Sequence, residues 1–338
     1  MRVQERLDQI FAIGGGPGAN RVHGTPGEDE AHALAADWLR EAGLEVVVDI
    51  DGNLLGHAGE RPDVWLGSHL DSVPRGGRFD GALGVVAAIE AVERVGAGSV
   101  VVFRGEEVGC VGSRACCDRA SQLPFAFLEV HVEQGPVLAD ADAQLGVVSG
   151  IVGYARGELV LEGREGHAGT TPMSARDDAL VGAAAEILRV RDAALAVEGA
   201  VATVGQVDVE PGGVNVIPSR VRLSLDVRAP DTERLDAVIA AIGFEPHNRV
   251  APVELRGAAR TALREAIAEA GIEVVELPSG AGHDAGILAA AGVDAAMLFV
   301  RSLNAGISHS PNELSSAGDI ALAVDVLTNA LARLVSAP

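Results

Sequence analysis

Histidine and acidic residues recur where buried strands are predicted to end, and together these side chain types bind metal ions. The run Gly67-Ser68-His69-Leu70-Asp71 follows an apolar stretch at 64–67. His69 could bind a metal through one ring nitrogen while Asp71 holds the ring in one tautomer. Asp80 follows closely, in Phe79-Asp80-Gly81. Taken alone, the run would also fit a solvent-exposed loop.

Two more predicted strands carry acids at or beyond their ends. The stretch 100–103 is followed by Arg104-Gly105-Glu106-Glu107. Because like charges in one site raise each other's pKa, one glutamate can bind a metal while the other moves protons. The stretch 126–132 leads into Gln134-Gly135, and its alternation places Glu129, His131 and Glu133 on one face.

A fourth cluster, Ser308-His309-Ser310-Pro311, follows the stretch 295–300. Each histidine alone could be structural, but four strand-end sites with nitrogen and oxygen ligands together predict a metal centre. This mixture of ligands suits zinc, manganese, cobalt or nickel, and we expect zinc or manganese. His23, His32, His57 and His247 match no motif, and we expect them to be exposed to solvent.

Alternating helix and strand patterns would position these residues. A helix from Thr25-Pro26 to Gly43 precedes a strand at 44–50, and strands 64–67 and 100–103 flank a helix at 84–95. This rhythm predicts a βαβ unit in a buried parallel sheet, which the strand 126–132 extends. Ligands bind at the carboxyl ends of such strands.

The pattern changes near Gly153 and resumes after Val250. The intervening order of strand, helix, two strands and helix predicts an inserted α+β domain. We therefore expect an α/β fold: a large catalytic domain, residues 1–151 and 251–338, with a mostly parallel central sheet flanked by helices, plus a smaller α+β domain at 152–250. The predicted elements after 152 are strand 158–162, helix 175–195, strands 201–208 and 220–227, helices 232–242 and 256–270, strand 273–277, helix 283–291, strand 295–300 and a helix from 316.

Composition excludes several classes of protein. Of the 338 residues, 48% are hydrophobic, which is enough for a globular core. The net charge is −22 and lysine is absent, so we expect no nucleic acid partner. No apolar run approaches the roughly 20 residues that span a bilayer, so we expect no membrane partner. Three cysteines within eight residues do not suggest disulfides, and we expect a cytoplasmic protein.

These motifs together resemble the M20 metallopeptidase superfamily and, within it, the hydantoinase/carbamoylase amidases. That branch includes N-carbamoyl-L-amino acid amidohydrolases, allantoate amidohydrolases and β-ureidopropionases. His131 marks the branch, because typical aminopeptidases and deacetylases of the superfamily have an acid there. The chain is shorter than is usual for the branch, with segments missing after Glu107 and after the helix 232–242.

The resemblance implies a role for each matched residue. Glu106 would be the general base, taking a proton from water and passing it to the leaving nitrogen. Asp71 would assist catalysis by orienting its metal-binding histidine. Two metal ions would activate the water and polarise the substrate carbonyl. The implied ligands are Asp80 as the bridge, His69 and His131 in one site, and Glu107 and His309 in the other.

The inserted domain resembles the family's lid, which also forms the interface of a homodimer. The resemblance implies that His167 and Asn215 hold the substrate or its developing oxyanion, His167 thereby aiding catalysis. Arg228 would grip a substrate carboxylate, since a guanidinium pairs bidentately with it. Without the resemblance, Arg228 would more readily be a surface residue paired with Asp226 or Asp231.

Two further residues are candidates for contact with the substrate. Gln134 lies in the matched run Glu133-Gln134-Gly135-Pro136, and His283 lies in Gly280-Ala281-Gly282-His283-Asp284. His283 would either touch the substrate or cap the helix that follows it.

The resemblance implies a metal-dependent hydrolase of non-peptide linear amide C–N bonds. Its substrate would be a small ureido or amide compound with a carboxylate, such as an N-carbamoyl-L-amino acid. Allantoate amidohydrolase is the near alternative, and an M20 dipeptidase or N-acyl-amino-acid deacylase is a second. A non-catalytic metal-binding scaffold is a third, but such a protein has no need of Glu106.

Overall fold

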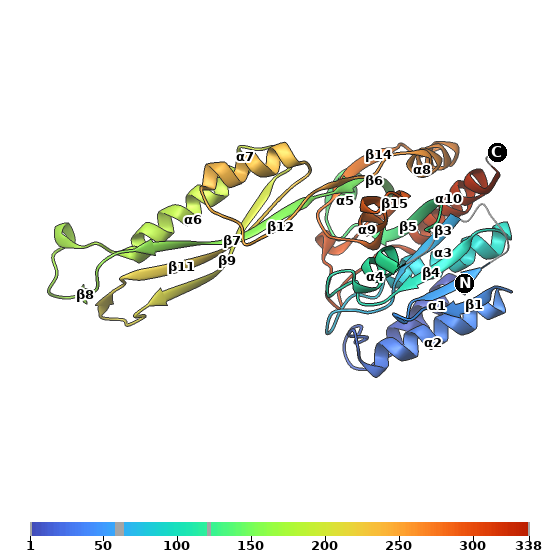
Figure 1. Ribbon diagram of the computed structural model, residues 1–338, viewed down its shortest axis with the longest axis horizontal. Coiled ribbons are helices and arrows are strands. Elements are labelled where there is room, and N and C mark those ends of the chain that lie inside the picture. Colours follow the sequence, from blue (N-terminus) through green and yellow to red (C-terminus); the bar gives the residue numbers. More distant parts are fainter. Residues whose placement is uncertain (1, 58–63, 120–122, 337–338) are drawn as a thin grey trace. The chain divides into compact units, whose positions relative to one another are not determined.

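The computed structural model describes residues 2–57, 64–119 and 123–336, and it divides into two compact units (Figure 1). Unit 1 comprises Met1–Gly150 and Glu254–Pro338, and unit 2 comprises Ile151–Val253. Among the described residues, no helix is long and apolar enough to cross a membrane.

Unit 1 is built on a nine-stranded sheet. Its strands are β1 (Glu45–Val48), β2 (Leu54–His57), β3 (Val64–His69), β4 (Ser99–Phe103), β5 (Ala126–Val132), β6 (Leu145–Ile151), β13 (Val253–Glu254), β14 (Val275–Ser279) and β15 (Asp294–Val300). The middle of the sheet, in the order β4-β3-β5-β15, is parallel. Antiparallel β2 and β1 extend it beyond β4, and antiparallel β6 extends it beyond β15.

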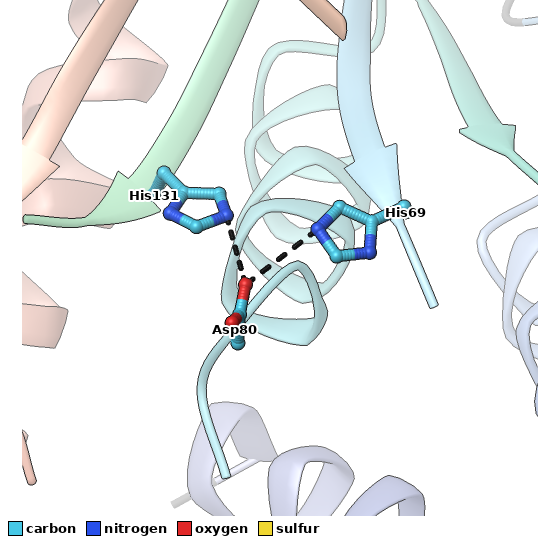
Figure 2. Close-up of side chains that lie close together, drawn as sticks. All are labelled: His69, Asp80 and His131. Atoms are coloured by element: carbon cyan, nitrogen blue, oxygen red, sulfur yellow. Dashed lines mark ion pairs between the residues drawn. The ribbon is translucent and has the colours of Figure 1, made fainter. Parts of the chain in front are cut away.

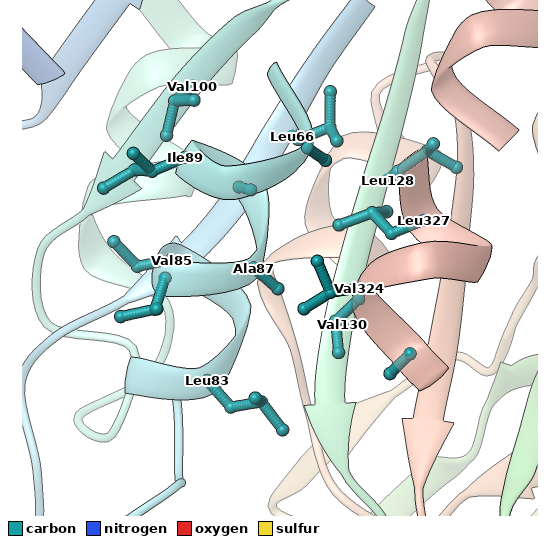
Figure 3. Close-up of a cluster of buried hydrophobic side chains, with 14 of the residues drawn as sticks. Leu66, Leu83, Val85, Ala87, Ile89, Val100, Leu128, Val130, Val324 and Leu327 are labelled. Carbon is teal, nitrogen blue, oxygen red and sulfur yellow. The ribbon is translucent and has the colours of Figure 1, made fainter. Parts of the chain in front are cut away.

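Helices cover this sheet. They are α1 (Arg2–Ala12), α2 (Pro26–Glu41), α3 (Ala82–Val95), α4 (Val111–Arg119), α5 (Val137–Asp140), α8 (Ala258–Glu269), α9 (Asp284–Ala290) and α10 (Ala317–Ser336), with a 3₁₀ turn at Asn304–Gly306. α3 is mostly apolar and every residue from Ala82 to Val92 is buried, as expected of a helix enclosed by other elements. It packs between β3, β5 and α10, where Leu83, Val130 and Leu327 are part of one core (Figure 3).

The alternation along β5 explains which residues reach the other face. Leu128, Val130 and Val132 belong to the core beside α3 and α10. Glu129 and His131 therefore point to the opposite face of the sheet. That face carries α9, whose Ala285 N–H donates to Glu129 Oε2 at 2.9 Å.

Unit 2 has a four-stranded antiparallel sheet in the order β12-β7-β11-β9. Two helices pack on it, and their core includes Val190, Leu225, Val227 and Val238. A two-stranded sheet of β8 and β10 lies at the end of the unit where β11 begins (Figure 1). The elements are β7 (Gly153–Glu162), β8 (Gly166–His167), a 3₁₀ turn (Met173–Ala175), α6 (Ala179–Leu195), β9 (Val201–Glu210), β10 (Val216–Ile217), β11 (Arg220–Ala229), α7 (Thr232–Ile242) and β12 (Asn248–Val250).

The predicted fold class is confirmed: unit 1 is α/β with a mainly parallel central sheet, and an α+β unit is inserted in it. Single elements differ from prediction. The strand expected at 44–50 ends at Val48, because the Asp49 carboxylate accepts N–H groups of Asp51 and Asn53 and turns the chain. Short β2 and polar α4 were not predicted, since neither has a clear hydrophobic period.

Of the four histidines expected to be exposed, only His247 is, since His23 and His57 are half-buried and His32 is buried. His32 was expected to be exposed, but its side chain is only 2% exposed on the inner face of α2. Neither ring nitrogen has a hydrogen-bond partner among the described residues. Burial, reinforced by the charge of Arg104, lowers the pKa of His32 to about 3.

This burial predicts a pH-dependent stability. The unfolded chain binds a proton at His32 near pH 6.5 whereas the folded protein does so only near pH 3, so stability falls as the pH drops below 6.5. His32→Leu should reduce the loss of unfolding free energy between pH 6.5 and pH 5 by up to about 2 kcal/mol. Urea denaturation at several pH values measures this. His247→Leu, at an exposed position, is the surface control, and a His32→Leu profile like that of the wild type would contradict the assignment.

Candidate metal centre

Three buried side chains meet where β3 and β5 end (Figure 2). His69 is the last residue of β3, His131 is next to last in β5, and Asp80 lies in the loop just before α3. Nε2 of His131 lies 3.2 Å from Oδ1 of Asp80, and Nε2 of His69 lies 3.6 Å from the same oxygen. Adjacent parallel strands end at one edge of the sheet, which is why both rings point at the same carboxylate.

A second group forms at the other oxygen of Asp80. Nε2 of His309 lies 3.4 Å from Oδ2 of Asp80 and 3.4 Å from Oε2 of Glu107. His309 comes from the loop after β15 and its side chain is half exposed, whereas the first group is buried throughout. One carboxylate therefore belongs to two candidate ligand groups.

The hydrogen bonds of the buried histidines favour a metal. Nδ1 of His69 lies 3.2 Å from Oδ1 of Asp71, and Nδ1 of His131 lies 2.9 Å from the backbone oxygen of Val132. Since these oxygens accept, each Nδ1 carries the hydrogen and each Nε2 presents a lone pair. Both Nε2 atoms are buried without a hydrogen-bond partner among the described residues. Lone pairs that face carboxylate oxygens need a cation between them, so these residues fit a divalent metal.

The charges around His131 and Asp80 lead to the same conclusion. Burial would lower the pKa of His131, but the nearby carboxylate of Asp80 raises it to about 9. Burial would raise the pKa of Asp80, but His131 and His309 hold it well below its ordinary value. The Asp80 carboxylate thus favours a positive charge at His131, and a metal ion bound there would displace a proton.

Glu106 lies beside the buried group and belongs to neither candidate ligand group. Its Oε2 is 3.8 Å from Nε2 of His69, and its Oε1 is 3.8 Å from Nδ1 of His283. Burial raises the pKa of Glu106 well above its ordinary value, with His69 opposing the shift and Asp284 adding to it. A carboxyl group of this kind is suited to receive and return a proton.

His283 is buried beside His131 and Glu106. Its ring lies 4.4 Å from that of His131, and its Nε2 lies 2.9 Å from Ser279 Oγ. It occupies the N-cap position of α9 but makes no side-chain capping bond, so the capping role considered from the sequence is wrong.

Gln134 and Glu313 hold the loops around Asp80. Nε2 of Gln134 donates to Oδ2 of Asp80 at 3.0 Å and lies 3.1 Å from Ser308 Oγ. Ser308 donates to Glu313 Oε2 at 2.8 Å, and Glu313 Oε1 accepts the N–H groups of Phe79 and Asp80. Buried Glu313 was not predicted from the sequence. Its position four residues after a ligand histidine was the only available signal.

The acids flanking His131 have other partners. Glu129 accepts a hydrogen bond from Ser68 Oγ at 2.7 Å and has a raised pKa because it is buried. Glu133 accepts the first N–H groups of α5 at 2.6 and 3.0 Å. The face expected to carry Glu129, His131 and Glu133 thus places only His131 among the candidate ligands.

The candidate residues of unit 2 lie at two different places within that unit. His167 in β8 pairs with Val216 in β10, beside Asn215, and both His167 and Asn215 are exposed. Arg228 is next to last in β11, and its Nε donates to Asp226 Oδ1 at 2.8 Å. The pairing of Arg228 with Asp226 is the alternative considered for it from the sequence.

Comparison with known proteins gives consistent matches over nearly the whole chain. The profile of peptidase family M20/M25/M40 matches residues 65–333. An N-carbamoyl-L-amino acid amidohydrolase of Geobacillus stearothermophilus is 35% identical over 402 residues, covering 98% of either chain. A ureidoglycolate hydrolase of Arabidopsis thaliana is 30% identical, covering 98% of this chain and 86% of its own.

A solved structure shows the same fold. A hydantoinase/carbamoylase family amidase from Burkholderia multivorans is 30% identical, with a TM-score of 0.92 over 100% of this chain and 98% of its own. The alignment with the Geobacillus protein is longer than the 338 residues of this chain, so that relative has segments that this chain lacks.

Gly81 offers a test of how tightly His69 is packed. Its φ is +64°, and a Cβ there would lie 2.5 Å from Cε1 of His69. Gly81→Ala should lower the unfolding free energy by about 2–4 kcal/mol, combining left-handed strain with the clash. Gly96→Ala, at the other end of α3 with φ +72° and open space around its Cβ, should cost only the strain of about 1–2 kcal/mol. If both variants lose the same unfolding free energy in urea denaturation, the His69 ring moves aside at no cost and is not tightly packed.

Proposed function

The chain belongs to peptidase family M20/M25/M40, in its hydantoinase/carbamoylase amidase branch, and we propose that it is a dinuclear amidohydrolase of N-carbamoyl-L-amino acids. As a member of that branch it is a hydrolase of amide C–N bonds. One observation carries the proposal: Asp80 belongs to two ligand groups, while Glu106 lies next to the buried group without joining either.

Two divalent ions are the proposed cofactors. His69, Asp80 and His131 would hold one ion, and Asp80, Glu107 and His309 the other. When bound, such ions lower the pKa of a water molecule and polarise a carbonyl group. Zinc or manganese is our first assignment, and cobalt or nickel also fits these ligands.

Glu106 is the proposed general base. Its carboxylate would accept the proton of the attacking water and then deliver it to the nitrogen that leaves the ureido carbon. Burial favours the protonated form of Glu106, which helps it to keep the proton until the C–N bond breaks. Asp71 positions both His69 and Glu106, because its carboxylate faces the His69 ring and accepts the Glu106 N–H at 3.1 Å.

Loss of both C–N bonds of the ureido group would give ammonia, carbon dioxide and a free amino acid. Gln134 and His283 lie at the metal centre, and we propose that both contact the substrate. Arg228 would bind the substrate carboxylate through its guanidinium. The three free cysteines fit a reducing compartment, and we propose a cytoplasmic enzyme.

The residues of unit 2 favour a homodimer. His167 and Asn215 lie where β11 begins, whereas Arg228 lies near its end, about 26 Å along the strand. One small substrate cannot touch both places in the same chain. We propose that His167 and Asn215 of one protomer serve the substrate held by Arg228 of its partner.

The surface of unit 2 supports this assembly. Val181, Leu188 and Leu195 are spaced seven apart on α6 and are 66%, 53% and 77% exposed. They form one apolar stripe, and β9 is an edge strand of the adjacent sheet. An apolar helix face beside an open sheet edge is a surface that a second copy can cover. Unit 2 would then act as both lid and dimerisation domain.

Two other activities remain as alternatives. Allantoate also has a ureido carbonyl near a carboxylate, and an allantoate deiminase of Glycine max is 31% identical over 86% of this chain. A dipeptidase or N-acyl-amino-acid deacylase would use the same ions. His131 favours the ureido substrates instead, because typical aminopeptidases and deacetylases of the superfamily have an acid at that position. Ammonia release from N-carbamoyl-L-amino acids and from allantoate, beside cleavage of N-acetyl amino acids and dipeptides, separates the three activities.

Glu106→Gln tests the proposed roles. The variant should bind two equivalents of metal while its kcat falls by about 10²–10⁴-fold. The neighbouring change Glu107→Gln removes a ligand and should lower the metal content as well as turnover. Metal analysis and ammonia assays on the same samples measure both. Full activity in Glu106→Gln would refute the role of the base.

Leu188→Arg tests the dimer. Placing a charge in the apolar stripe should convert a dimer into a monomer in light scattering, with loss of turnover but retention of bound metal. Ile50→Arg, at a position 90% exposed in unit 1, is the control and should change neither property. If the wild-type protein is monomeric and active, the proposed sharing of residues fails.

A further inference from the structure

The turn that carries Glu106 and Glu107 is held by buried carboxylates at three successive N–H groups. Asp71 accepts two of them, from Glu106 to Oδ1 and from Glu107 to Oδ2, each at 3.1 Å. Glu28 Oε1 accepts the third, from Gly105, at 3.2 Å. The backbone from which both glutamate side chains project is thus fixed on each side of the peptide between Gly105 and Glu106.

Glu28 is itself held firmly. Its side chain is fully buried in the first turn of α2, and its Oε2 accepts the N–H of Gly24 at 2.8 Å. Arg104 Nη1 lies 3.2 Å from Oε2, and His23 Nδ1 lies 3.1 Å from Oε1. These hydrogen bonds and ion pairs restrain the Glu28 carboxylate in one position. The carboxylate therefore restrains the turn to which it is bound.

His23 closes the remaining side of the turn. Gly105 has φ +63°, and a Cβ there would lie 2.8 Å from Nδ1 of His23. The imidazole therefore lies directly against the Gly105 backbone, while Glu28 holds both groups. A histidine that matched no motif in the sequence packs against the turn that presents the two glutamates.

We propose that Glu28 is a positioning residue for Glu106 and Glu107. By accepting the Gly105 N–H, Glu28 orients the backbone of the turn. This orientation directs the Glu107 side chain toward His309 and Asp80 and the Glu106 side chain toward the substrate. The role toward Glu106 rests on the proposed function, whereas the role toward Glu107 concerns metal binding alone. Outer partners of this kind typically change metal affinity or activity by about 10–100-fold.

The first test is stepwise metal binding. Zn²⁺ or Mn²⁺ is titrated calorimetrically into the metal-free wild type and into Glu28→Gln, whose amide donor opposes the N–H groups that Glu28 accepts. Because Glu107 belongs to only one ligand group, one binding step should weaken about 10–100-fold while the other stays within threefold. Should Glu28→Gln fail to fold, Glu28→Asp replaces it with the same expectation.

Asp29→Asn is the matched control. Asp29 is the next residue of α2, is 70% exposed and also pairs with Arg104 Nη1, at 2.6 Å. The substitution removes an ion pair of Arg104 and leaves the hydrogen bonds of the turn in place. The dissociation constants of both metal-binding steps should therefore equal those of the wild type. Equal weakening in the Asp29 and Glu28 variants would overturn the proposal, because Arg104 would then be the residue that matters.

The second test separates positioning from stability. In Glu28→Gln, kcat per bound metal pair should fall about 10–100-fold with little change in KM. If the variant only lowers the melting temperature, while binding both ions and turning over as the wild type, Glu28 is merely structural and the proposal fails. If the wild type hydrolyses no ureido substrate, the proposed function fails, and the metal titration still decides the role of Glu28.

Discussion

The structure is governed by the need to keep several carboxylates together in a largely buried site. Asp71, Asp80, Glu106 and Glu107 converge at one edge of the sheet, and burial raises the pKa of both glutamates. Like charges in a buried site repel unless cations or N–H dipoles compensate them. The chain has no lysine, so the compensation comes from histidine, arginine, backbone N–H groups and the proposed metal ions.

Backbone N–H groups take a large share of this task. Asp71, Glu28 and Glu313 each accept two of them, and each joins loops that are far apart in the sequence. Arg21 adds a fully buried positive charge, with Nε donating to the Leu70 oxygen at 2.7 Å. Burial lowers the pKa of Arg21 to about 10, so it stays charged at neutral pH. Asp71 therefore both adds negative charge to the centre and holds one of its loops, while Glu28 and Glu313 hold the neighbouring loops.

The sequence alone predicted the fold class because the parallel strands and long helices are strongly apolar or periodic. The resemblance to the M20 superfamily implied His69, Asp80, Glu107, His131 and His309 as ligands, and the structure brings these residues together in two groups. Their shared cause is topological, since strand ends meet at one sheet edge. Glu28, Glu313 and the burial of His32 were out of reach, because each depends on contacts across long sequence separations that leave no local pattern.

The two ligand groups differ in their exposure to solvent. This difference would determine the order in which the two proposed ions leave the protein. His69 and His131 are buried, whereas His309 is half exposed and has a left-handed backbone, with φ +51°. A left-handed conformation is strained for a residue with a Cβ and persists only where its surroundings enforce it. Under the dinuclear proposal, a chelator would thus remove the ion at His309 rapidly and the ion at His131 slowly, so that the protein passes through a state with one ion.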